Sequence, residues 1–256
     1  MKQIFLREPS TSFDKALSMD GAVINKSRAK MQFEEYANFL KEGNREVKIL
    51  PPITDYPDSC FIEDTALVYK NQALITNIGA KSRKGENELT RSVLEKNGIE
   101  ITELPEGATL DGGDILINKN LAFIGISKRT NRAGFEAASE FLKQFKIITT
   151  PVKLTKFLHL KCICSSPTSD YIFATENISF LSPLYELEEC IKIPLDEALA
   201  ANIISNGNDF LIPAGNQKTL RILKERGLSV KTIDFSEFLK ADGSLSCLHL
   251  KDYAIS

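Results

Sequence analysis

The chain has 256 residues, of which 43% are apolar and 26% charged, and its formal net charge is −2. This length is near the upper limit for one hydrophobic core, and the weak charge argues against nucleic-acid binding. No run approaches the roughly 18 apolar residues of a membrane span, and the N-terminal apolar run is too short for a secretory signal. The five cysteines include no Cys-x-x-Cys pair, which argues against a disulfide scaffold or zinc ribbon and favours a reduced, cytoplasmic protein.

A unit of apolar strand, polar turn and apolar strand recurs along the chain. Four predicted hairpins share this pattern: 65–76, 114–126, 161–174 and 202–212. Short β-rich runs separated by Asn, Ser and Gly are typical of hairpins. A further strand is predicted at 245–250, and its partner would be the N-terminal segment 3–6.

Amphipathic helices are predicted between the hairpins. Apolar residues at helical spacing mark four of them: 30–41, 86–96, 132–144 and 216–225. The segment around 183–190 has the weakest signal. The units begin about 40–50 residues apart, a period typical of radial or stacked repeats. We therefore predict a closed α/β ring of five units, with the helices outside and the strand ends converging on an axis; an open α/β sheet is the alternative.

Residues with catalytic chemistry stand at the entrances to these units. The first unit opens with Glu63 and Asp64, the second with the Asp-Gly-Gly-Asp segment 111–114, and the third with His159. The last predicted strand carries Cys247. Because equivalent positions in a ring face the same axis, we expect these side chains to meet there.

Cys247 is the candidate nucleophile. An isolated cysteine in a cytosolic strand is usually an inert, buried side chain. Cys247, however, follows an Asp-Gly turn at 242–243 that would expose it. The other cysteines lie within or beside apolar patterns and are assigned to the core: Cys60, Cys162, Cys164 and Cys190.

The chain has two histidines, so a general acid or base has few candidates. His159 is the first of them. His249 is a rival, because side chains alternate along a strand and it would share a face with Cys247. Two residues along a strand span roughly 6–7 Å, which is a poor distance for direct proton transfer.

Asp58, Glu63 and Asp64 could form a solvated acidic turn, but Glu63 and Asp64 stand between two apolar runs. Carboxylates in such surroundings need a cationic partner, and a guanidinium substrate would be one. The segment 111–114 supplies too few ligands for a calcium loop, so no metal is expected. We expect Gly112 and Gly113 to let the backbone come close to a ligand.

These residues lie in five segments that resemble the dimethylarginine dimethylaminohydrolases of the guanidine-modifying pentein superfamily. The segments follow the family's order and span nearly the whole chain: 57–65, 110–114, 127–131, 158–161 and 242–247. The resemblance implies a five-bladed α/β propeller, in agreement with the predicted ring, and a single catalytic domain over residues 1–256. The chain departs from the family at 77–78, where many relatives have Arg-Pro, and at His249, where they have a small residue.

The resemblance also implies roles for individual residues. Cys247 would be the nucleophile, His159 the general acid and base, and Asp111 the carboxylate that orients His159 or the substrate. Carboxylates would hold the guanidinium or α-amino end of the substrate, and arginines its α-carboxylate: Asp58, Glu63 and Asp64, and Arg83 and Arg129, respectively. A lid would come from 17–23, beginning at Leu17.

The implied activity is hydrolysis of Nω-methylated L-arginine to citrulline and a methylated amine, through a covalent S-alkylthiouronium on Cys247. The expected partner is a small guanidino amino acid, with no metal or organic cofactor, no nucleic acid and no membrane. The alternatives are arginine deiminase, citrulline hydrolase and amidinotransferase, or a non-catalytic pentein that serves as a binding protein. The oligomeric state stays open, with a homodimer as one option.

Overall fold

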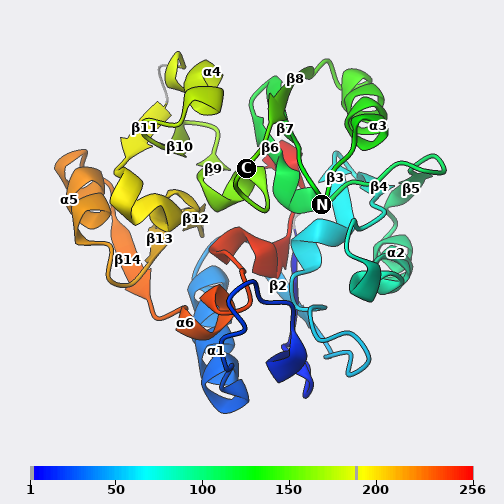
Figure 1. Cartoon of the computed structure of the whole chain (residues 1–256), viewed down its shortest axis with the longest axis horizontal. Helices are drawn as coiled ribbons and strands as arrows, with labels where there is room; N and C mark the ends of the chain where they lie inside the picture. The colour runs from blue at the N-terminus through cyan, green and yellow to red at the C-terminus, as the bar shows by residue number, and fades with distance from the viewer. Residues whose placement is uncertain (1–2, 188–189, 256) are drawn as a thin grey trace.

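The strands form five three-stranded sheets around a central axis. The computed structural model describes residues 3–187 and 190–255. In every sheet the middle strand is antiparallel to the first strand and parallel to the third. The longer helices lie at the outside of the ring (Figure 1). The predicted five-bladed α/β propeller is therefore confirmed, and the open sheet is wrong.

Each sheet combines a hairpin with the strand that follows the next helix. Four sheets take their strands in chain order: β3 (Ala66–Tyr69), β4 (Gln72–Ile75) and β5 (Glu100–Glu103); β6 (Ile115–Asn118), β7 (Leu121–Ile126) and β8 (Ile148–Lys153); β9 (Cys164–Thr168), β10 (Tyr171–Thr175) and β11 (Cys190–Ile193); β12 (Ile204–Ser205), β13 (Phe210–Pro213) and β14 (Val230–Ile233). The remaining sheet joins both ends of the chain: β15 (His249–Leu250), β1 (Gln3–Arg7) and β2 (Glu46–Leu50).

The chain ends close the ring by pairing with each other. Leu6 of β1 lies opposite His249 of β15, and Phe5 lies opposite Leu250. The prediction that the N-terminal segment supplies the missing strand is confirmed. Closure of this kind leaves the last unit dependent on contacts between residues more than 240 positions apart in the sequence.

Helices connect the middle strand of each sheet to its third strand. Their bounds are α1 (Lys26–Lys41), α2 (Glu86–Lys96), α3 (Arg132–Lys143), α4 (Ser182–Tyr185) and α5 (Gln217–Glu225), and a further short helix, α6 (Ser236–Leu239), follows β14. Asn25 begins α1 by accepting a hydrogen bond from the Arg28 amide, and Asn131 caps α3 in the same way through the Gly134 amide. None of the helices in the described ranges combines the length and the apolar character that a membrane crossing needs.

Short 3-10 helices precede the first strand of each sheet. Their bounds are Ile62–Thr65, Gly112–Asp114, Leu160–Cys162, Leu195–Ala201 and Leu245–Leu248. Others lie elsewhere: Phe13–Lys15, Lys81–Arg83, Ser179–Leu181 and Tyr253–Ile255. The prediction that strands begin at residues 161 and 245 is wrong, because both segments start as 3-10 turns. These turns, rather than the strands, carry the residues that face the axis.

Buried polar contacts join the turns to one another. The side-chain amide of Asn202 donates to the carbonyl of Lys161 at 2.7 Å and to Ser246 Oγ at 3.0 Å, and its oxygen accepts from the Ser246 amide at 2.8 Å. Asn202 is fully buried, so its amide would be unpaired without these contacts. One side chain of the fourth unit thus fixes the third unit against the fifth.

Apolar clusters fill the space between each helix and its sheet. In the second unit, Phe135, Ala138 and Leu142 of α3 pack against Ile117 and Ile124 of the sheet beneath. Burial of a side chain such as Leu142 contributes about 1.5–3 kcal/mol. The cores therefore lie outside the ring's centre, which leaves the axis to the polar turns.

Candidate active site

A cavity of about 190 Å³ opens at the centre of the ring. It is lined by residues from four of the five units and from the segment before α1: Leu17, Ser18, Met19, Asp58, Phe61, Asp64, Arg83, Arg129, Leu158, His159, Ala241, Asp242, Gly243 and Cys247. The expectation that chemistry-bearing residues of separate units meet on one axis is thus met for Cys247, His159 and Asp64.

Cys247 is the third residue of the 3-10 helix Leu245–Leu248. The Ser244 amide donates to its sulfur at 3.4 Å, and 8% of the residue's surface is exposed, within the cavity. Burial raises the pKa of the Cys247 thiol well above its usual range, and the charges of Glu63 and Asp64 add to this effect. The empty site therefore favours the thiol over the thiolate.

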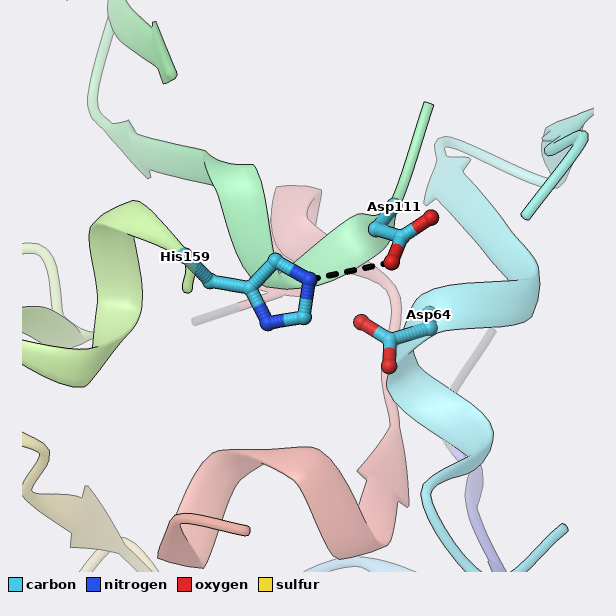
Figure 2. Close-up of side chains that lie close together, drawn as sticks. All are labelled: Asp64, Asp111 and His159. Carbon is cyan, nitrogen blue, oxygen red and sulfur yellow. Dashed lines mark hydrogen bonds and ion pairs between the residues drawn. The ribbon is translucent and has the colours of Figure 1, made fainter. Parts of the chain in front are cut away.

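His159 and Asp111 form a buried pair beside this thiol. Nε2 of His159 lies 3.0 Å from Oδ2 of Asp111 (Figure 2). The Gly79 amide donates to Oδ1 of Asp111 at 2.8 Å. Asp111 itself lies behind the imidazole rather than in the cavity lining. Because Asp111 binds one ring nitrogen, Nδ1 is the nitrogen left for proton exchange with a substrate.

The imidazole of His159 lies between carboxylates. Burial alone would lower its pKa, but the charge of Asp64, the hydrogen bond to Asp111 and the charge of Asp114 outweigh burial and raise the pKa to about 9. Figure 2 shows the Asp64 carboxylate beside the ring, on a segment different from that of Asp111. His159 is therefore protonated at neutral pH and can act as an acid.

Asp64 is held by two donors. Arg83 Nη1 lies 2.6 Å from Oδ2, and the Gly113 amide donates to Oδ1 at 3.0 Å. Burial would raise the pKa of Asp64, but the His159 and Arg83 cations overcome it and lower the pKa to about 2. Asp64 thus keeps its negative charge in the cavity wall.

Arg83 was expected to bind the α-carboxylate of a substrate, but its donors are already used inside the protein. Nε and Nη2 bind the Glu86 carboxylate at 3.0 and 2.8 Å, Nη2 also binds the Phe61 carbonyl at 3.0 Å, and Nη1 binds Asp64. Four of its five N–H groups are therefore occupied. Arg83 braces Asp64 instead, and its partner Glu86 carried no signal in the sequence beyond its place at the start of a helix.

Glu63 was expected at the guanidinium, but its carboxylate lies in a different cavity. Lys161 and Ser246 bind it, Ser246 at 2.8 Å, and Tyr253 Oη lies 3.4 Å away. The adjacent residue Asp64 faces the Cys247 cavity. Lys161 already supplies the cationic partner that the sequence argument sought in a substrate.

Gly112 and Gly113 serve contacts between units rather than contacts with a ligand. A Cβ on Gly112 would lie 2.0 Å from the Glu63 carbonyl oxygen, and one on Gly113 would lie 2.8 Å from Cγ and Nδ1 of His159. Both distances are too short for any side chain. The glycines therefore allow the second unit to pack against the first and third, which corrects the sequence interpretation.

The segment 17–19 covers one side of the cavity. The Leu17 amide donates to Asp58 at 3.1 Å and the Met19 amide to Asp242 at 2.7 Å, and Met19 is 74% exposed. Burial raises the pKa of Asp58 and of Asp242. In the sequence Asp242 was identified only as part of an Asp-Gly turn, and the structure confirms the turn, with a φ of 56° at Asp242.

Arg129 is the arginine of the Cys247 cavity whose guanidinium is most available to a ligand. Its Nη1 lies 3.9 Å from Asp111 Oδ2, and its side chain is 17% exposed. Unlike Arg83, it has no close hydrogen-bonded carboxylate among the described residues. Its guanidinium can therefore receive a carboxylate in the bidentate geometry that arginine favours.

His249 does not share a face with Cys247. Its Nδ1 lies 2.7 Å from Tyr36 Oη, and its ring borders the same cavity as Glu63. Burial lowers the pKa of His249 well below its usual range, and the Lys251 and Lys161 charges add to the effect. The turn at residues 245–248 places the two residues on opposite sides, so His249 is not the base for Cys247.

The remaining cysteines lie away from the cavity lining. Cys60 and Cys164 are buried, in agreement with their assignment to the core, whereas Cys162 and Cys190 are half-buried. Burial raises the pKa of the Cys162 thiol to about 12. The buried and the half-buried cysteines therefore both remain thiols, rather than thiolates, at neutral pH.

Potential ligand atoms of Asp64, Asp111 and His159 lie within 4.8 Å of one another. This spacing alone would suit a metal ion. However, Asp111 and His159 already bind each other, and Asp64 binds Arg83. The arrangement is that of an oriented imidazole between two carboxylates, which is suited to proton transfer.

A propeller of ββαβ units with a cysteine, an Asp-bound histidine and carboxylates at its axis defines the guanidine-modifying pentein class. The family model described as N,N dimethylarginine dimethylhydrolase, eukaryotic, matches residues 4–178. The N(G),N(G)-dimethylarginine dimethylaminohydrolase of Pseudomonas aeruginosa is 31% identical over 98% of this chain and 99% of that protein. The chain belongs to the dimethylarginine dimethylaminohydrolase family.

Solved structures agree with this assignment. A cysteine-to-serine variant of the Pseudomonas aeruginosa enzyme, complexed with citrulline, matches with a TM-score of 0.90 at 29% identity, over 97% of this chain and 98% of that one. The N-terminal domain of ArgZ, a cyanobacterial arginine dihydrolase bound to its product, shares the fold with a TM-score of 0.88 at 21% identity, over 99% of each chain.

Proposed function

We propose that this protein hydrolyses Nω-methylated L-arginine to citrulline and a methylated amine, acting as one catalytic domain. The observation that carries the proposal is that Cys247 and the protonated His159 border one carboxylate-lined cavity. Membership of the family and the citrulline complex of the Pseudomonas aeruginosa relative support it.

The substrate cation would lie between the acids of the lining. Asp64 keeps its charge, and Asp58 faces the same cavity, so together they offer oxygen acceptors for guanidinium or α-ammonium N–H groups. Arg129 would bind the α-carboxylate. The segment beginning at Leu17, held to Asp58, would act as a lid over the bound substrate.

The first half of the reaction forms a carbon–sulfur bond and breaks a carbon–nitrogen bond. A bound guanidinium opposes the carboxylates that raise the pKa of Cys247, so the thiol releases its proton to solvent. The thiolate attacks the central guanidinium carbon. His159 then donates the Nδ1 proton to the departing nitrogen, which leaves as dimethylamine or methylamine, and an S-alkylthiouronium stays on Cys247.

The second half hydrolyses this intermediate. The neutral His159 takes a proton from water, and the hydroxide attacks the thiouronium carbon. The carbon–sulfur bond breaks, and the hydroxyl proton returns to the leaving sulfur as the ureido group of citrulline forms. The site recovers the thiol and the imidazolium with which it began, having consumed one water.

The replacement Cys247→Ser tests the proposal. We expect it to abolish citrulline formation from dimethylarginine while leaving the fold and substrate binding in place, as measured by a colorimetric ureido assay and by calorimetry. The substitution Cys162→Ser is the matched control, because that half-buried thiol is absent from the cavity lining. Turnover retained by the Cys247 variant would exclude the mechanism.

A substrate panel separates the proposal from the related activities. Turnover of dimethylarginine, arginine and citrulline should be compared under one set of conditions, with citrulline, ornithine and ammonia measured as products. Citrulline produced fastest from dimethylarginine supports the proposal. Faster turnover of arginine, or no turnover of any member, would instead favour a deiminase or dihydrolase, or a non-catalytic binding protein.

A further inference from the structure

A second cavity, of about 80 Å³, lies at the ring's centre and shares no lining residue with the Cys247 cavity. Neighbours in the sequence divide between the two: Glu63 and Ser246 border the second, while Asp64 and Cys247 border the first. A water needs roughly 10–15 Å³ by this measure, so the second cavity has room for several waters or one small ion.

Cations predominate in the lining of this second cavity. Arg45, Lys161 and Lys251 border it together with His249, and Glu63 is its acidic member. Lys161 is already bound to Glu63. Across the described ranges, neither Arg45 nor Lys251 is within ion-pair distance of a carboxylate.

The nearest further acid does not line the cavity. Asp252 acts on Arg45 through its charge and raises that group's pKa, though burial dominates and lowers it. Its oxygens accept hydrogen bonds from the amides of Lys70 and Asn71. The lining thus holds three basic side chains, Arg45, Lys161 and Lys251, against the single acid Glu63, and Asp252 offsets part of the Arg45 charge from outside the lining.

Burial, and then the positive charge of the lining, lower the pKa values of two basic groups that border the cavity. Burial lowers the pKa of Lys251 to about 7, and the charges of Arg45 and Lys161 lower it further. Burial and then the charges of Lys251 and Lys161 lower the pKa of His249. An anion in the cavity would relieve each of these repulsions at once.

One residue of the lining, Thr168, has a hydroxyl with no hydrogen-bond partner among the described residues. Its Oγ1 is covered by neighbouring atoms rather than open to the cavity. Oxyanion binding would therefore depend on the charged nitrogens of Arg45 and Lys251, which are strong donors to such anions.

We propose that this second cavity is a binding site for a small oxyanion of the phosphate or carboxylate class, with Arg45 and Lys251 as its charged ligands. The Glu63–Lys161 pair forms part of its wall, and Ser246, the residue before the nucleophile, donates a hydrogen bond to Glu63. The site is distinct from Arg129, which faces the Cys247 cavity.

Calorimetric titration of the full chain with inorganic phosphate, and separately with acetate, tests the proposal. We expect Lys251→Met and Arg45→Met each to weaken binding at least tenfold. The charge-conserving Lys251→Arg should retain affinity within about twofold, which distinguishes lost charge from a damaged fold. Lys143→Met, at an exposed position of α3, is the matched surface control and should bind as the parent does.

Proton NMR of the two imidazoles locates the bound anion. Phosphate or acetate should shift the His249 signals and raise the pH at which they titrate, while those of His159 stay in place. Phosphate binding without acetate binding would assign the phosphate class, and the reverse the carboxylate class. The proposal is overturned if neither anion binds, if Arg129→Met rather than Lys251→Met abolishes binding, or if only the His159 signals move. Because the readout is binding rather than turnover, these outcomes do not depend on the catalytic proposal.

Discussion

Tyr36 Oη lies 2.6 Å from the carbonyl oxygen of Leu245 and donates a hydrogen bond to it. Leu245 begins the 3-10 helix that carries Cys247, so a side chain of the outer helix α1 positions the nucleophile's own turn. The same hydroxyl lies 2.7 Å from His249 Nδ1, which must be the donor because the phenolic proton is already given to Leu245. His249 therefore has a buried hydrogen-bond partner on α1.

Replacing Tyr36 by Phe should loosen this turn. The Leu245 carbonyl and the His249 Nδ1–H would each lose a buried partner, so we expect a loss of about 1–3 kcal/mol of unfolding free energy. Activity should also fall, because Cys247 lies in the 3-10 helix that begins at Leu245. Urea unfolding and citrulline assays measure the two effects. Tyr171→Phe is the control, since the Tyr171 ring packs against Phe173 and its hydroxyl makes no hydrogen bond to any residue that the structure describes; equal losses in both variants would contradict the assignment.

Replacing Asp111 by Asn should lower the pKa of His159 from its value of about 9. The hydrogen bond and the charge of Asp111 are two of the effects that raise this pKa against burial. With the imidazole less often protonated and poorly oriented, we expect turnover to fall by about 10²–10⁴. NMR titration of the two histidines measures the pKa directly. Asp170→Asn, at an exposed turn, should leave both quantities unchanged, and an unshifted His159 titration in the Asp111 variant would exclude the role.

The contribution of His159 to the stability of the protein should decrease as the pH rises from about 6.5 to 9. The folded-state pKa of His159 is raised from 6.5 to about 9, so its contribution is complete below 6.5 and is lost as the pH passes through the folded value. A shift of this size corresponds to roughly 3 kcal/mol. Lys251, whose pKa is lowered from 10.5 to about 7, contributes in the opposite direction over this range, so the test is a difference between variants. In urea unfolding, the stability difference between the parent and His159→Gln should shrink as the pH rises. The difference between the parent and His249→Gln should stay constant, because the pKa of His249 is lowered. Parallel curves for the parent and His159→Gln would be evidence against the prediction.

Replacing Glu63 by Gln should make Cys247 more reactive in the empty enzyme. After burial, the Glu63 charge contributes most to the raised pKa of this thiol, and the substitution also releases the Lys161 cation. We expect the midpoint of iodoacetamide alkylation to move to lower pH. The protein should also lose several kcal/mol of stability, about 3–5, because a buried cation loses its partner. Glu140→Gln on the surface of α3 serves as control; an unchanged alkylation profile would show that Glu63 does not act on the thiol.

Local pattern was sufficient to predict most of the elements. The hairpins were predictable because their turns contain residues that accept positive φ, such as Lys70 and Asn71 at 48° and 61°. The helix predicted at 86–96 matches α2 at both ends. The short helix α4 was missed as a distinct element because its single turn gives too little periodicity to detect.

Side-chain direction at the axis was not predictable in the same way. A strand would have placed Cys247 and His249 on one face, whereas the turn that contains Cys247 has about three residues per turn and separates them. The same geometry sends Glu63 and Asp64 to different cavities. The partner of Arg83 was not predictable from the sequence, because Glu86 lies in a helix whose orientation depends on packing.

The sequence by itself determined the five repeated units, the residues at their entrances and the resemblance to one family, because these depend on periodicity and on motifs a few residues long. Tertiary structure alone decided which entrance residues share the Cys247 cavity and which line the second one. The physical reason is that ring closure brings β1 and β15 together and packs the 3-10 turns against each other. Only that packing determines whether a buried charge meets a protein partner, as Glu63 meets Lys161, or is left facing a cavity, as Asp64 is beside His159.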